Sequence, residues 1–117
     1  MRKHLAIISL VVATGISGAA VAHHGWGSYD ASRMMRIESS ITHLEWQNPH
    51  VHIAMNHNGG TWALVLAPPF RMEARGLSPD LIKVGTRVRA EGYPSTRVQR
   101  ELRAERIVVG DKTYELR

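Results

Sequence analysis

The chain has 117 residues, carries a formal net charge of +5 and contains no cysteine. This length suits one small domain, and the lack of cysteine excludes a disulfide framework, so a hydrophobic core has to hold the fold together. The charge balance is only mildly basic, which gives little support to a nucleic-acid-binding function.

The first 22 residues have the pattern of a secretory signal peptide. A basic start precedes an apolar run over residues 5–16, and small residues ending in Ala-Val-Ala follow. The apolar run is shorter than the roughly 20 residues that a membrane-spanning helix needs. We therefore expect cleavage after Ala22, export to the periplasm of a Gram-negative bacterium, and no membrane span after cleavage. The mature chain would begin at His23 and have 95 residues and a net charge of +3.

The start of the mature chain predicts an arm followed by a long strand. Residues 23–33 contain glycine, serine and histidine without periodicity, so we expect an extended arm. Residues 35–46 alternate as a strand, but the apolar positions up to Ile41 have one parity, whereas Leu44 and Trp46 have the other. This change of phase predicts a β-bulge or a sharp bend within the strand.

A β-hairpin is predicted next. Residues 50–56 alternate cleanly, with apolar side chains facing one way and His50 and His52 facing the other. Asn-Gly-Gly at 58–60 predicts a tight turn, and residues 61–66 form the return strand.

A helical connection and a further strand follow the hairpin. Residues 70–75 lie between a proline pair and a glycine, which predicts a short helical segment. Ser-Pro-Asp at 78–80 repeats the signal for a helix start, with the serine as the expected cap. Residues 86–91 then alternate as a strand.

The last third of the chain is less regular. Arginine recurs at every third position over residues 97–106, which gives no clean strand phase, so a strand is expected only at 107–109. A Gly-Asp turn and a closing strand over 112–116 complete the chain. Five or six short strands with one helical connection predict an all-β, OB-like Greek-key barrel over residues 34–117.

Three stretches carry a resemblance to a known family: Ala-His-His at 22–24, E-W-Q-N-P-H at 45–50, and L-I-K-V-G-T-R-V-R-A-E-G-Y-P at 81–94. On these residues the chain is identified as a member of the family catalogued as domain of unknown function 6152, a group of small exported bacterial proteins. The resemblance covers essentially the whole mature chain, and the E-W-x-N-P-H string is its most specific part. Gly25 and Trp26 depart from the serine and phenylalanine usual there. The resemblance implies an exported OB-like domain and no particular activity.

Four histidines of the mature chain are candidate metal ligands: His23, His24, His50 and His52. The last two are at positions i and i+2 of a strand, so their Cα atoms are expected about 6.5 Å apart and both imidazoles can reach one ion. Cleavage would give His23 a free α-amine. That amine, its own ring and one further imidazole form the three-nitrogen arrangement called a histidine brace, and planar nitrogen ligands favour Cu(II). The competing interpretation gives His50 a structural role in a turn and His52 one in a hydrogen-bond network, and treats the adjacent histidines at the cleavage site as incidental.

A metal-independent binding module is the alternative function. Small barrels of this type bind extended polar ligands on one face and its loops, so a peptide, a glycan or an envelope protein partner is expected in that case. The candidate contacts are two aromatic residues, one acid and two bases: Trp46, Trp62, Glu45, Arg87 and Arg89. No nucleophile elbow, phosphate loop or H-E-x-x-H motif occurs, so the sequence gives little support to an enzyme.

Overall fold

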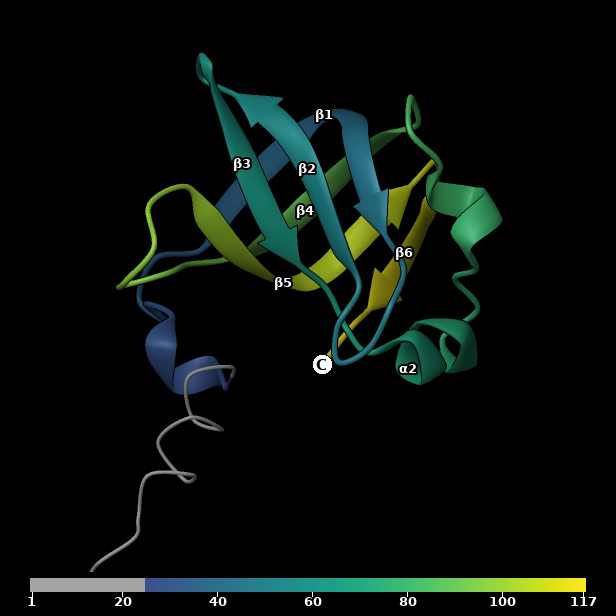
Figure 1. Ribbon diagram of the computed structural model, residues 1–117, viewed down its shortest axis with the longest axis horizontal. Helices are drawn as coiled ribbons and strands as arrows, with labels where there is room; N and C mark the ends of the chain where they lie inside the picture. Colours follow the sequence, from purple (N-terminus) through teal and green to yellow (C-terminus); the bar gives the residue numbers. More distant parts are fainter. Residues whose placement is uncertain (1–24) are drawn as a thin grey trace, which may run out of the picture.

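The computed structural model describes residues 25–117, so the expected signal peptide and the start of the predicted arm lie outside the described residues. In the described part, the chain forms a closed five-stranded β-barrel with a sixth strand beside it and one α-helix between two of the strands (Figure 1). The all-β prediction with one short helical connection is confirmed. Between residues 25 and 117, no helix has the length and apolar character needed to cross a membrane.

Six strands form one sheet: β1 (Met35–Glu45), β2 (His52–His57), β3 (Gly60–Val65), β4 (Arg87–Pro94), β5 (Glu101–Val109) and β6 (Lys112–Glu115). Their order is β3-β2-β1-β4-β5-β6, with antiparallel neighbours throughout. A parallel pairing between β3 and β5 closes the first five strands into a barrel. This closed five-stranded Greek-key arrangement confirms the predicted OB-like fold.

The change of phase in the first strand is a β-bulge. The register between β1 and β2 shifts between Ile41 and His43, which leaves Thr42 as the extra residue. Ile37 and Ile41 are buried in the core before the bulge, and Leu44 packs against the core after it. The bulge lets β1 pair with β4 along its first half and with β2 along its second half.

The prediction for residues 97–106 was wrong, because β5 already begins at residue 101. The register between β5 and β4 shifts at Glu105, which is a second bulge. Leu102 and Ala104 are buried before this bulge, and Ile107 is buried after it. A bulge reverses the parity of the inward-facing positions, so the sequence of this strand shows no single alternation.

The connection from β3 to β4 contains helix α2 (Pro69–Ala74) and the 3-10 turn η2 (Pro79–Ile82). Proline at the first position favours the start of both α2 and η2. The Ser78 side chain makes no capping hydrogen bond. Three apolar side chains of this connection are fully buried and complete the core: Met72, Leu77 and Ile82. The connection therefore adds side chains to the core as well as joining β3 to β4.

The described part of the predicted arm is docked on the barrel. It begins with the 3-10 turn η1 (Trp26–Ser28) and then runs beside the loop between β4 and β5 (Figure 1). Tyr29 forms an isolated β-bridge with Ser95, and the Asp30 amide donates to the Pro94 carbonyl at 2.9 Å. Segment 25–30 therefore has a fixed path along the barrel wall.

Candidate functional site

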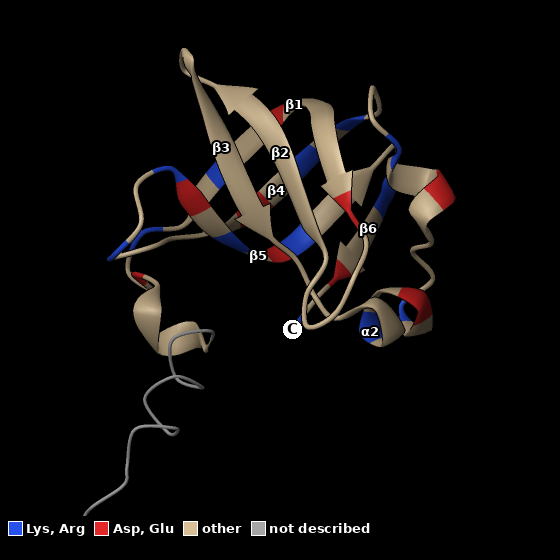
Figure 2. Cartoon of the chain, in the orientation of Figure 1, with Lys and Arg blue, Asp and Glu red and all other residues tan. Residues whose placement is uncertain are grey.

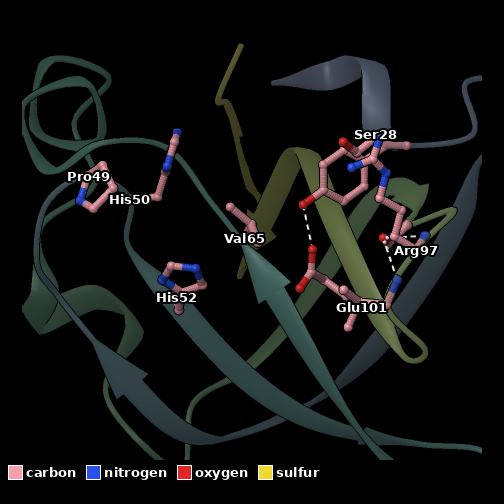
Figure 3. A pocket seen from close by; sticks show the side chains of 10 residues that line it. Ser28, Pro49, His50, His52, Val65, Arg97 and Glu101 are labelled. Carbon is pink, nitrogen blue, oxygen red and sulfur yellow. Dashed lines mark hydrogen bonds between the residues drawn. The ribbon is translucent and has the colours of Figure 1, made fainter. Parts of the chain in front are cut away.

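A pocket of about 220 Å³ opens on the outer face of the barrel, where the β2–β3 face meets the loops β1–β2 and β4–β5 (Figure 3). Ligands of OB folds bind at this combination of strands and loops. The lining residues come from both loops, from strands β2, β3 and β5, and from segment 25–30: Ser28, Tyr29, Pro49, His50, His52, Val65, Ser95, Arg97, Val98 and Glu101.

The strand registers explain why these side chains meet. Glu45 pairs with His52, His52 with Val65, Val65 with Arg103, and Arg103 with Tyr93. Cross-strand partners project on the same side of a sheet, so these residues form one row across the barrel. The neighbours of His52 in β2 point into the core, so the row lies on the outer face. Two members of this row, His52 and Val65, line the pocket.

Both strand histidines predicted as metal ligands line the pocket. His52 lies in β2, and His50 precedes that strand in the β1–β2 loop. Nδ1 of His52 is buried and has no hydrogen-bond partner among the residues described. Nε2 of His50 lies 3.4 Å from Nη2 of Arg103. A buried nitrogen without a partner indicates an atom that a water molecule or an ion could satisfy, so His52 is the more available of the two.

These two histidines do not complete a metal site by themselves. Over residues 25–117, no group of three or more His, Cys, Asp or Glu side chains is arranged to hold a metal ion. The other two predicted ligands, His23 and His24, lie outside the described residues.

Segment 25–30 forms one wall of the pocket and is held by side chains of the barrel. The Tyr29 hydroxyl donates to Oε2 of Glu101 at 2.5 Å. Burial, together with the hydrogen bond to Glu101, raises the pKa of Tyr29 well above its ordinary value. The Ser28 carbonyl accepts hydrogen bonds from the amide and the hydroxyl of Thr96, at 2.9 and 3.0 Å. This wall is therefore an ordered part of the site.

The predicted aromatic and acidic contacts lie elsewhere on the barrel. Trp46 and Trp62 are half-buried and pack against the core, and Trp62 also meets the edge of the His57 ring, with centroids 5.8 Å apart. Glu45 shares the row of His52, but its Oε2 lies within hydrogen-bond distance of Nε2 of His43, at 3.1 Å. These three side chains are not part of the pocket lining.

The two predicted arginines lie on β4, at a separate hollow of about 220 Å³. Arg87 forms an ion pair with Glu38 at 3.5 Å, and Arg89 forms one with Glu91 at 3.4 Å. Basic and acidic residues are interspersed along β4 and β5 (Figure 2). The structure therefore places His50 and His52 at one pocket, and the lining of that pocket contains none of the five predicted ligand contacts.

Glu91, beside Arg89, provides a test of the ion pairs on this face of the barrel. Glu91 contacts Arg36, Arg89 and Arg106 at 3.2, 3.4 and 3.1 Å. The hydrogen bond from Arg106 lowers the pKa of Glu91 below its usual range. Because the folded pKa is lowered, Glu91 stabilises the fold fully above its unfolded pKa of about 4.3, and this stabilisation is lost as the pH falls through the folded pKa.

We therefore expect Glu91→Gln to unfold at a lower temperature than the wild type near pH 7, with the difference shrinking as the pH falls towards about 2. Thermal unfolding followed by circular dichroism at several pH values measures this difference. Glu38→Gln is the matched control, since Glu38 is half-exposed and its pair with Arg87 is long. A difference in unfolding temperature that stays constant with pH would contradict the lowered pKa of Glu91.

The fold and the pocket define the chain as a small OB-like β-barrel with an open pocket on its outer face. Its family follows from the sequence: the chain belongs to the Family of unknown function (DUF6152), which matches residues 10–102. No curated protein matches the chain.

Solved structures are similar in fold, and one of them is described here. The crystal structure of the ZRD-deleted mutant of TiaS in complex with agmatine is similar, with a TM-score of 0.51 and 14% sequence identity. The similar region covers 74% of this chain and 27% of that chain. At this identity the likeness shows the fold alone.

Proposed function

We propose that this protein is an exported binding module that holds Cu(II) at the pocket on its outer face. The ligands are the mature amino terminus of His23, the ring of the same residue, and the imidazole of His52 or His50. One observation carries the proposal: His50 and His52 line the same pocket whose wall includes Ser28 and Tyr29, only a few residues after His23.

The length of chain between the wall and His23 is compatible with this arrangement. The Arg103 guanidinium contacts both segment 25–30 and the β1–β2 loop. It lies 4.4 Å from the centroid of the Trp26 ring, and its Nη2 lies 3.4 Å from Nε2 of His50. His23 lies three positions before Trp26 in the sequence. An extended stretch of three residues spans up to about 10 Å. This short length of chain supports the proposed meeting of the His23 amine with the pocket.

The chemistry of the donors favours copper. An α-amine and imidazoles are nitrogen ligands, which Cu(II) binds in a planar set and more tightly than other divalent metals of the first row. The amine has an ordinary pKa of about 7.7–8.0 and must lose its proton to bind, so affinity should rise as the pH passes through this range. Nδ1 of His52, which has no partner in the described structure, supplies a nitrogen inside the protein.

Titration of the mature, untagged protein with Cu(II) tests the proposal, after intact mass has verified that the chain begins at His23. We expect one ion per chain and a loss of affinity of about 10-fold or more in His23→Ala and His52→Ala. An extra alanine before His23 should cause a similar loss, because it removes the amine from the chelate. His43→Ala is the matched control, since His43 pairs with Glu45 outside the pocket. Weak binding that none of these changes affects would overturn the proposal.

The charge of the pocket favours a second candidate, a metal-independent module for a small anionic peptide or glycan. Arg97 and two imidazoles line the pocket against one carboxylate, Glu101, which already accepts a hydrogen bond from Tyr29. Such a lining also offers contacts for a ligand that carries a carboxylate. Thermal stabilisation of the metal-free protein by such ligands, with none by Cu(II), would support this candidate over the first.

A further inference from the structure

The hollow at Arg87 and Arg89 lies on a different part of the barrel from the pocket with the histidines. Its volume is about 220 Å³, and its lining residues are Glu38, Arg87, Val88, Arg89, Val108 and Gly110. None of these six residues lines the pocket of His50 and His52. Val88 and Ala90 are buried in the core, so the two arginines, which alternate with them along β4, project from the outer face. We call this cavity the β4 hollow.

Both arginines of the β4 hollow have ion pairs without hydrogen bonds. The described residues contain six ion pairs between an arginine and a glutamate, and four of them include a hydrogen bond of 2.9–3.2 Å. The two without one are the pair of Arg87 with Glu38, at 3.5 Å, and the pair of Arg89 with Glu91, at 3.4 Å. These two guanidinium groups therefore have donors left for a ligand.

Arg89 lacks a hydrogen-bonded partner because Glu91 is shared among three arginines. Glu91 accepts hydrogen bonds from Arg36 and Arg106, at 3.2 and 3.1 Å. Arg106 has Glu115 as a second carboxylate at 2.9 Å, whereas Arg89 has no second carboxylate within residues 25–117. Nε of Arg89 is buried and makes no hydrogen bond in the described chain. A buried N–H without a partner costs free energy, which a ligand oxygen that reaches it would recover.

We propose that the β4 hollow binds a phosphate group between Arg87 and Arg89. Near pH 7 a phosphate monoester carries about −1.5 to −2 charges and three acceptor oxygens, which suits two guanidinium groups. A carboxylate carries a single charge, so it neutralises two such groups less well. The Arg87 and Arg89 side chains are 65% and 40% exposed, so a ligand reaches both from solvent. The Glu38 carboxylate competes for Arg87, but its ion pair is long and its side chain is half-exposed, so it is free to turn away.

The size of the β4 hollow favours a phosphate that is carried on a larger molecule. The volume equals that of about seven water molecules, so phosphate alone, with five non-hydrogen atoms, fills only part of it. Val108 is half-buried and pairs with Arg89 across the two strands, so its side chain lies on the same face. An ester that joins the phosphate to an apolar body should therefore bind more tightly than the free ion.

Titration of the isotope-labelled wild-type protein with inorganic phosphate at low ionic strength tests the proposal, followed by the NMR signals of backbone amides and arginine Nε–H groups. We expect saturable shifts of the Arg87 and Arg89 Nε–H signals and of the Val108 and Gly110 amides. Potassium chloride at the same ionic strength should not cause these shifts. A wild type without saturable shifts would overturn the site, and acetate that binds as tightly as phosphate would overturn the choice of phosphate.

Four variants test which side chains bind the phosphate. Arg89→Gln and Arg87→Gln should each weaken binding by about 10-fold, because each removes a charged donor. Arg87→Gln keeps the test valid if Arg89→Gln fails to fold, since the Arg87 side chain is largely exposed. Glu38→Gln should tighten binding by about 3-fold, because it removes the competing carboxylate. Arg33→Gln is the matched control, since it removes the same charge outside the lining. Equal losses of affinity in Arg33→Gln, Arg87→Gln and Arg89→Gln would overturn the proposal, because net charge alone would then explain the binding.

Phenyl phosphate as a second probe distinguishes the two sources of the phosphate group. Tighter binding of phenyl phosphate than of inorganic phosphate supports a phosphate ester as the ligand. Equal affinities overturn the role of the apolar wall and support the free ion. Neither result depends on the proposed copper function, because the β4 hollow and the pocket have no lining residue in common.

Discussion

Replacing Gly92 with alanine should destabilise the barrel by about 3 kcal/mol or more. Gly92 is buried in β4 opposite the bulge of β5, and a Cβ built there would clash with the Arg103 carbonyl and lie 2.8 Å from the Cα of Ala104. These obstacles are backbone atoms, which cannot rotate away as a flexible side chain would. Strands β4 and β5 would have to separate next to Arg103, the residue at which β5 also pairs with β3.

Urea unfolding followed by circular dichroism measures this effect, with Gly27→Ala as the control. A Cβ at Gly27 would meet nothing within 4 Å, so its substitution should change the free energy of unfolding by no more than about 0.5 kcal/mol. Equal unfolding midpoints for the two variants would show that β4 and β5 are not packed as closely as described.

The second large effect is expected in helix α2, where Met72→Ala should cost about 2–5 kcal/mol. A helix of six residues is not stable alone in water, so α2 depends on the side chains that it buries. Met72 is fully buried in the core, and its truncation removes apolar contacts and leaves a cavity.

Phe70→Ala provides the comparison within the same helix. Phe70 is 68% exposed, so its truncation should leave the free energy of unfolding within about 0.5 kcal/mol of the wild type. Thermal and urea unfolding of both variants give the two values. If Phe70→Ala were as costly as Met72→Ala, the orientation of the helix on the barrel would be wrong.

The parts of the fold that local chemistry determines could be predicted from the sequence. Asn58 and Gly59 have φ angles of +50° and +80°, which is the conformation that the Asn-Gly pair favours in a two-residue hairpin turn. The apolar positions change parity around Thr42, which predicted the bulge observed in β1. The alternation of residues 50–56 indicated that His50 and His52 share a face, and both line one pocket.

Features that depend on distant parts of the chain could not be predicted. The bulge at Glu105 has no local signal, because a charged residue in an arginine-rich stretch is compatible with either face of a strand. The pocket needs the parallel pairing of β3 with β5 and the docking of Tyr29 on Glu101. Nothing in the spacing of these residues along the sequence indicates that they meet, so Tyr29, Ser95 and Glu101 were not found as site residues.

The parallel pairing of β3 with β5 also bears on how the protein avoids aggregation. Each of the first five strands has a neighbour on both sides, and within the described chain β6 alone has one side open. An open strand edge is where another chain can add by backbone hydrogen bonding. The β6 edge is only four residues long, and Lys112, Thr113 and Glu115 are exposed on it. Because short strands with charged side chains resist such addition, closure of the barrel leaves little surface on which fibrous self-association could begin.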